Sequence, residues 1–239
     1  MTLEPVIGER ALLEDKTKTL IIGDLHLGFE LTLLDKGIHI PSQDRTLLSM
    51  LNALIAKTGA RRLVINGDII DPLFRKWRMR YRLQDFIKGM AVKDVHLIKG
   101  NHDGRIEDIV PKGARLHQSG GARFGEYGVA HGHRVPSKRA TAAKILIISH
   151  SHLVVSLRDR LGITFREPCW LRFKDDRREV MVIPPFNPFM GGHPVNSPSR
   201  RESVVFSKGL ADIDRSDVYL LDGTHLGTVS DIMLQELGL

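Results

Sequence analysis

The stretch Leu20-Ile21-Ile22-Gly23-Asp24-Leu25-His26-Leu27-Gly28 decides how the rest of the chain is interpreted. Its apolar start, residues 20–22, is typical of a buried strand that ends at Gly23. Asp24 and His26 follow at once, and residues two apart in an extended chain point to the same side. We therefore expect a carboxylate and an imidazole to project together beyond the carboxyl end of a strand, where open α/β sheets bind their ligands.

The same arrangement recurs four more times along the chain. Each time a β-rich apolar run stops and Asp, Asn or His follows directly; the runs and their polar motifs are 63–65 with Asn66-Gly67-Asp68-Ile69-Ile70-Asp71, 95–98 with Lys99-Gly100-Asn101-His102-Asp103, 127–130 with His131-Gly132-His133, and 145–148 with Ser149-His150-Ser151-His152. One such match arises easily by chance, whereas five in order do not. If these strands lie side by side in one sheet, their ends converge on one point.

The side chains at these strand ends are carboxylate, imidazole and amide groups, with no thiolate among them: Asp24, His26, Asp68, Asn101, His131, His150 and His152. This set suits Mn²⁺, Fe²⁺ or Zn²⁺ better than a soft metal. It exceeds the needs of one tetrahedral ion and fits two ions, roughly 3.5–4 Å apart, that share a bridging carboxylate. Such a pair neutralises phosphoryl oxygens and lowers the pKa of a bound water, so that hydroxide exists near neutral pH and can attack phosphorus. Without cations, the converging carboxylates of Asp24 and Asp68 would repel each other.

Length and composition narrow the class of protein. The 239 residues suffice for a sizeable core, and we expect a single domain over residues 1–239 because no repeat or composition break marks a second one. No apolar run approaches the roughly 20 residues of a membrane span, and the first ten residues lack an apolar signal region. The single cysteine, Cys169, excludes an internal disulfide and a cysteine-based zinc site. We expect a cytoplasmic protein with no membrane partner, and its net charge of +7 favours anionic partners such as nucleic acid.

Several elements can be predicted from periodicity and turn residues. A helix should open after Pro41, run to about Lys57 and stop at Gly59, between two parallel strands. Towards the end of the chain we expect a hairpin of residues 168–173 and 179–183, a long loop over 184–199, and closing strands at 204–206, 218–221 and 226–229. The glycines form neither a dinucleotide fingerprint nor a P-loop, so the sequence does not indicate a nucleotide-binding fold of those types.

The segment 71–82 interleaves cations with aromatic residues and has two interpretations. It can contact nucleic acid, with its cations on phosphates and its aromatic rings on stacked bases. It can also be an amphipathic helix with a solvated basic face and a buried aromatic face, since Trp77 and Tyr81 have helical spacing. We favour the second interpretation for the aromatic residues, while the cations remain candidates for attracting a phosphodiester.

Taken together, the motifs resemble those of the calcineurin-like metallophosphoesterase superfamily. They are Gly-Asp-x-His at 23–26, Gly-Asp-x-x-Asp at 67–71, Gly-Asn-His-Asp at 100–103, His-Gly-His at 131–133 and His-x-His at 150–152. The resemblance implies an α/β metallophosphoesterase fold, a four-layer αββα sandwich of two mixed β-sheets flanked by helices, with a dinuclear centre. One departure is Ser149, which stands where the family usually has Gly.

The resemblance also implies a role for each site residue, with one ion held by Asp24, His26 and His152, the other by Asn101, His131 and His150, and Asp68 as the bridge. His102 would face the scissile phosphate as a catalytic leaving-group acid or charge stabiliser, oriented by Asp71. His133 would be a neighbour of the ligands. The cofactors would be two divalent ions, Mn²⁺ first, with Fe²⁺, Zn²⁺ or Ni²⁺ as alternatives.

A narrower resemblance is to DNA-ligase-associated phosphoesterases and their archaeal relatives. It depends on the helix after Pro41, the segment 158–170 ending in Glu-Pro-Cys-Trp, and the run 184–192, Pro-Pro-Phe-Asn-Pro-Phe-Met-Gly-Gly. It implies a phosphodiesterase acting on a substrate such as DNA or RNA, with DNA-repair proteins as candidate partners.

Two other functions remain open. The first is a phosphomonoesterase acting on proteins or nucleotides, but protein phosphatases of this superfamily usually carry Arg and Glu where Pro72 and Asp103 stand. The second is a non-catalytic metal-binding scaffold. Such members lose metal ligands, and none is lost here.

Overall fold

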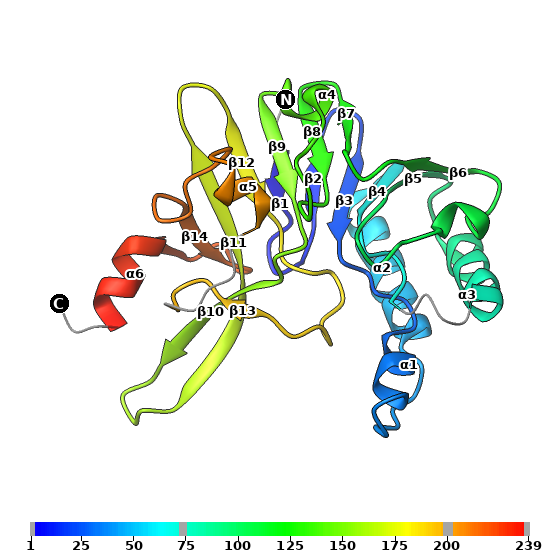
Figure 1. The fold of residues 1–239 in the computed structure, drawn as a ribbon, viewed down its shortest axis with the longest axis horizontal. Coiled ribbons are helices and arrows are strands. Elements are labelled where there is room, and N and C mark those ends of the chain that lie inside the picture. Colours follow the sequence, from blue (N-terminus) through cyan, green and yellow to red (C-terminus); the bar gives the residue numbers. More distant parts are fainter. Residues whose placement is uncertain (1–2, 72–75, 198–202, 237–239) are drawn as a thin grey trace.

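The computed structural model describes residues 3–71, 76–197 and 203–236, and its strands form two mixed sheets that stack face to face (Figure 1). The first sheet has the order β1-β2-β3-β4-β5-β6. Strands β3 to β6 are parallel, and β1 and β2 are added antiparallel. Their bounds are β1 Leu3–Pro5, β2 Leu12–Glu14, β3 Thr19–Gly23, β4 Arg62–Asn66, β5 Asp94–Ile98 and β6 Ala114–His117.

The second sheet has the order β13-β10-β11-β12-β9-β8-β7, and β14 and β15 are attached through β11. Strands β8, β9 and β12 are parallel, while β11 and β12 form the hairpin predicted over 168–183. Strand β11 also pairs with β10, and together they form an arm that projects from the sheet (Figure 1). The bounds are β7 Ala122–Phe124, β8 Tyr127–Ala130, β9 Ile145–Ile148, β10 Leu153–Arg158, β11 Thr164–Lys174, β12 Glu179–Val182, β13 His193–Pro194, β14 Asp217–Leu220 and β15 His225–Thr228.

Helices cover the outer face of each sheet. Helices α1 (Phe29–Leu34), α2 (Asp44–Thr58) and α3 (Lys76–Gly89) share an apolar core with the first sheet, and α4 (Lys138–Thr141), α5 (Val204–Ser207) and α6 (Val229–Glu236) share one with the second. A short 3-10 turn, η2, spans Ile106–Asp108. The predicted four-layer αββα sandwich is therefore confirmed. None of the helices in the described segments is both long and apolar enough to span a bilayer.

Successive side chains of β3 point to opposite faces of the first sheet, and both faces are buried. Leu20 and Ile22 point into the core beneath α2 and α3, whereas Ile21 points into the core between the sheets. A strand that is buried on both faces has no solvent side, so its sequence is a continuous apolar run. Helix α2 ends as predicted, because Gly59 adopts a left-handed conformation with φ of 64°.

The register of the strands aligns their carboxyl ends. Gly23 is paired with Asn66 and Asn66 with Ile98 in the first sheet, and Ala130 is paired with Ile148 in the second. The five motifs do not follow strands of one common sheet, since β3, β4 and β5 belong to one sheet and β8 and β9 to the other. The polar motifs still converge, because the two sheets stack with these ends on the same side.

One expectation near the end of the chain was wrong, because residues 204–206 form helix α5 instead of a strand. The strand predicted at 226–229 is present as β15, one residue earlier, and α6 begins at Val229. A run of three or four apolar residues fits a strand and a helix equally well. The packing of Val205 and Phe206 against the outer core of the second sheet determines the outcome.

The aromatic face predicted for the segment 71–82 was wrong at Tyr81, which is 63% exposed. The face of α3 that packs on the first sheet consists instead of a methionine, a leucine and a phenylalanine: Met79, Leu83 and Phe86. Residues 72–75 and the side chains of 76–78, Trp77 among them, lie outside the described part of the chain.

Candidate metal centre

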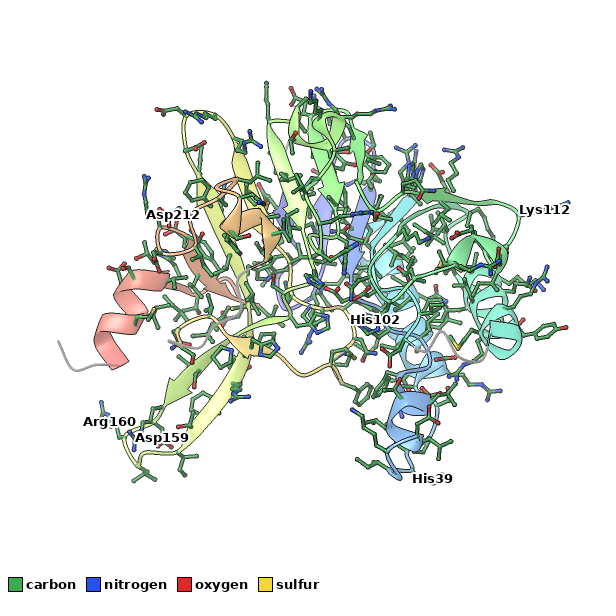
Figure 2. All side chains as sticks on the ribbon, in the orientation of Figure 1. His39, His102, Lys112, Asp159, Arg160 and Asp212 are labelled. Carbon is green, nitrogen blue, oxygen red and sulfur yellow. The ribbon has the colours of Figure 1, made fainter. Side chains whose placement is uncertain are left out.

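The structure brings the nine predicted site residues together at the edge where both sheets end: Asp24, His26, Asp68, Asp71, Asn101, His102, His131, His150 and His152. Figure 2 shows His102 at this edge, between the arm whose tip carries Asp159 and Arg160 and the projection beyond α1 that carries His39. The side that His102 faces is thus bounded by two protruding elements. His133 lies beside the cluster, with its ring 5.2 Å from that of His131.

Backbone hydrogen bonds join the turns that follow β3 and β4. The N–H of His26 donates to the carbonyl of Asp68 at 2.8 Å, and the N–H of Asp71 donates to the carbonyl of Leu27 at 2.9 Å. The two turns therefore run side by side beyond the sheet. This pairing places Asp24 and His26 next to the turn that carries Asp68 and Asp71.

The turns are held in an unusual backbone conformation. Five of the six described non-glycine residues with positive φ lie in the cluster: Asp24 at 51°, His26 at 46°, Asp68 at 43°, His150 at 71° and His152 at 43°. Each such residue costs roughly 1–2 kcal/mol, so the surrounding structure must hold it there. Asp24 and His26 do not have the extended conformation that was expected. They enter the same site because both are left-handed, not because a strand alternates.

The first group of candidate ligands consists of Asp24, His26 and His152. Nε2 of His26 lies 3.4 Å from Nε2 of His152, which in turn lies 3.4 Å from Oδ1 of Asp24. Asp24 is fully buried and accepts the backbone N–H of His150 on both oxygens at 3.2 Å. Two imidazole nitrogens and one carboxylate oxygen thus face one another across a short distance.

The second group consists of Asp68, His131 and His150, with Asn101 beside them. Nε2 of His131 lies 3.2 Å from Oδ2 of Asp68 and 3.0 Å from Oδ1 of Asn101. Burial lowers the pKa of His131, but the hydrogen bond with Asp68 and the charge of Asp24 outweigh it, so that the pKa is raised overall. The carboxylates of Asp24 and Asp68 therefore favour a positive charge on the His131 side chain.

Asp68 lies between the two groups. Its Oδ2 is 3.7 Å from Nε2 of His26 on one side and 3.2 Å from Nε2 of His131 on the other. Its Oδ1 accepts the backbone N–H of His102 at 2.9 Å. Burial alone would raise the pKa of Asp68, but its hydrogen bonds and the neighbouring imidazoles hold that pKa well below its usual range.

Asp71 orients two histidines at once, where the sequence had predicted one. Its Oδ1 lies 3.1 Å from Nδ1 of His26 and 3.1 Å from Nδ1 of His102. The hydrogen bond with Asp71 raises the pKa of His102 to about 9 against the effect of burial. The side chain of His102 is 42% exposed and Asn101 beside it is exposed as well, whereas Asp24 and Asp68 are buried. His102 therefore lies in the part of the cluster that a substrate can reach.

Ser149 anchors the imidazole of His131. The Oγ of Ser149 donates to the carbonyl of Asn66 at 2.6 Å and lies 3.0 Å from Nδ1 of His131. A proton on Nδ1 then leaves the Nε2 lone pair of His131 pointing at Asp68 and Asn101. The departure from the family's glycine thus adds a hydroxyl that accepts a hydrogen bond from Nδ1 of His131. The serine fits because position 23 is glycine, where a Cβ would lie 2.7 Å from Cβ of Ser149.

Asp103 supports the backbone of the site, and this role was not predicted from the sequence. It is fully buried, and it accepts the N–H groups of Ile69 and Ile70 on Oδ1 and of Gly100 on Oδ2. It therefore ties the turn after β4 to the turn after β5. Its only signal in the sequence was its place as the last residue of Gly-Asn-His-Asp. Burial and the charge of Asp68 raise its pKa to about 6.

We expect Gly67→Ala to disrupt the centre. Gly67 has φ of 76°, and a Cβ there would lie 2.1 Å from Nδ1 and 2.7 Å from Cβ of His131, so the imidazole must move away from Asp68. Gly37→Ala is a matched control, because φ is 79° and nothing lies within 4 Å of the added Cβ. In chemical denaturation, Gly67→Ala should lose roughly 2 kcal/mol more than Gly37→Ala. Equal losses would contradict the close contact.

Comparison with a solved nuclease structure supports the fold. Nuclease MPE of Pseudomonas putida superposes with a TM-score of 0.63 at 20% sequence identity, over 92% of this chain and 98% of that one. Yfce, a phosphoesterase from E. coli, matches with a TM-score of 0.41 at 14% identity, over 87% of this chain and 96% of that one. No curated protein matches the chain.

The family comparison covers most of the chain and all of the cluster. The model of the calcineurin-like phosphoesterase family matches residues 17–209. The matched range includes all five motifs and both groups of candidate ligands. The chain belongs to the calcineurin-like phosphoesterase family.

Proposed function

We propose that this protein is a dinuclear metal-dependent phosphoesterase that hydrolyses phosphodiester bonds. The observation that carries the proposal is the position of Asp68, whose Oδ2 lies between the imidazole of His26 and the imidazole of His131. A single carboxylate oxygen between two groups of ligands is the arrangement needed to bridge two ions. DNA or RNA as substrate, and the narrower resemblance to DNA-ligase-associated phosphoesterases, belong to the same proposal.

The residues present fit a pair of divalent ions. One ion would be held by Asp24, His26 and His152, and the other by Asn101, His131 and His150, with Asp68 shared. Histidines that bind metals usually donate their second N–H to a carboxylate or a carbonyl. His26 does so to Asp71, and His131 has Ser149 and the carbonyl of Asn66 at its Nδ1. Nitrogen and oxygen donors without thiolates favour Mn²⁺, with Fe²⁺, Zn²⁺ or Ni²⁺ as alternatives.

The chain's own residues supply orientation and proton transfer. When bound, a pair of divalent ions supplies positive charge for the phosphoryl oxygens and acidifies water. Asp71 holds the proton of His102 on Nδ1, which fixes the ring and directs Nε2 towards the side of Asp68 at 4.0 Å. From there a protonated His102 can donate the Nε2 proton to the departing oxygen or stabilise its charge. The partial exposure of His102 leaves room for a phosphate ester to reach it.

Three features support a diester substrate. The protein of similar fold with the higher TM-score is described as a nuclease, the chain carries a net charge of +7, and Asp103 occupies the position where protein phosphatases carry Glu. Asp103 is fully committed to three backbone N–H groups, so it serves the scaffold of the site.

Parallel assays with Mn²⁺ test this substrate class. We expect hydrolysis of bis(p-nitrophenyl) phosphate to exceed that of p-nitrophenyl phosphate, and single-stranded DNA or RNA oligonucleotides to be cleaved. Addition of EDTA should abolish each activity, because the carboxylates and imidazoles alone do not activate water. Activity on the monoester alone would contradict the proposal and indicate a phosphomonoesterase.

We expect His102→Ala to leave the metal content unchanged and to lower kcat by about 100-fold or more, the usual contribution of a general acid. Metal content is measured by mass spectrometry on the purified protein and kcat on the model diester. His39→Ala, at an exposed histidine far along the projection beyond α1, is the control and should change neither. A loss of metal from His102→Ala would show that His102 is a ligand.

Asp68→Asn should deplete both ions, because its carboxylate is shared by the two groups and an amide binds divalent ions less strongly. Asp24→Asn is the matched comparison, since Asp24 belongs to the first group only and should deplete one ion. Titration of the metal-free proteins with Mn²⁺, followed by calorimetry, measures both stoichiometries. Full occupancy of both ions in Asp68→Asn would exclude a bridging role.

A further inference from the structure

The segment between β12 and β13 passes directly beside the first group of candidate ligands. Figure 1 shows it leaving the second sheet and reaching towards α1 before it returns. At its start, the N–H of Phe186 donates to the carbonyl of Gly23 at 2.8 Å. At its end, the N–H of His193 donates to the carbonyl of His152 at 3.0 Å, and the backbone of Gly191 is hydrogen-bonded to the His152 side chain.

Asn187 holds the tip of this segment in place. Its side chain is fully buried, and its Nδ2 donates to the carbonyl of Leu25 at 3.1 Å. Its Oδ1 accepts the N–H of Phe189 at 3.0 Å, and its carbonyl accepts the N–H of Met190 at 3.2 Å. Phe189 is therefore flanked at two residues' distance by Asn187, which contacts the Asp24–His26 turn, and by Gly191, which contacts His152.

The ring of Phe189 is supported on one side and open on the other. It stacks on Phe29 with ring centroids 5.8 Å apart and an angle of 13° between the planes. Phe29 is 7% exposed and follows His26 by three residues, and its N–H donates to the carbonyl of His26 at 3.2 Å. Phe189 itself is 49% exposed. A buried ring thus backs an exposed one at the rim of the metal centre.

We propose that Phe189 is a specificity-determining residue on which an unpaired nucleobase of the substrate stacks. The inference rests on the proposed function and names its substrate class, a single-stranded or locally unpaired nucleic acid. A flat, fixed aromatic ring binds any base through its face, whereas the bases of an intact duplex are already stacked on one another. Phe189 places this contact on the segment that is hydrogen-bonded to the Asp24–His26 turn and to His152, beside the candidate metal ligands.

Phe165 provides a matched control. It is 44% exposed, comparable with Phe189, but it lies in β11 on the projecting arm. No ring contact among the described residues involves it. Substitution of Phe165 therefore removes the same type of side chain at a similar exposure, away from the segment that carries Phe189.

Two substrates distinguish stacking from support of the site: oligothymidine, and an abasic polymer of the same length built from tetrahydrofuran phosphate units. We expect Phe189→Ala and Phe189→Leu each to lower kcat/KM on oligothymidine by about tenfold, the loss of one base–aromatic stack. Neither should change kcat/KM on the abasic polymer. Phe189→Trp should retain activity on both, and Phe165→Ala should match the wild type. The leucine variant keeps an apolar cover over Phe29, so it separates the loss of stacking from damage to the fold.

A binding measurement on an inactive variant tests base stacking separately from hydrolysis. In the His102→Ala background with Mn²⁺, fluorescence anisotropy of labelled oligothymidine should show a Kd about tenfold weaker after Phe189→Leu, with no change for the abasic polymer. Equal effects on both polymers, or none on oligothymidine, would overturn the inference even if the protein proves to be a diesterase. A wild type that binds and cleaves only model monoesters would overturn the proposed function as well.

Discussion

The carboxylate of Asp68 lies between side chains that follow strands of both sheets. One of its oxygens faces imidazoles from both sheets, and the other accepts the backbone N–H of His102. A buried carboxylate without compensation is too costly to persist in a folded protein. The turns that end β3, β5 and β8 must therefore approach Asp68 closely, and the stacking of the two sheets with their carboxyl ends on one side makes that approach possible.

The close approach explains the backbone of the site. An added Cβ at Gly100 would lie 2.2 Å from both the amide nitrogen and Oδ1 of Asp68, so this position has no room for a side chain. Left-handed conformations at Asp24, His26 and Asp68 turn the chain immediately after each strand. Their strain is opposed by the hydrogen bonds between the turns and by buried Asp103. Short turns on rigid strands hold functional groups more accurately than long loops do.

Exposure divides the site into an inner and an outer part. Asp24, Asp68 and His131 are buried, and their carboxylate and imidazole groups make them candidate metal ligands. His102 and Phe189 are partly exposed, and each is fixed from behind, His102 by Asp71 and Phe189 by Phe29. A substrate would therefore meet groups that are already oriented, which reduces the entropy lost on binding.

The amino-acid sequence by itself determined where strands end, which donor types follow them, and where helix α2 stops, because these depend on local apolar runs and on single residues such as Gly59. It did not determine which sheet each strand joins, the exposure of Tyr81, or whether residues 204–206 are helical. Nor did it indicate that Asp71 is shared by two histidines. Only the tertiary structure decided these points, because each depends on packing between residues far apart in the chain, which short-range pattern and propensity do not encode.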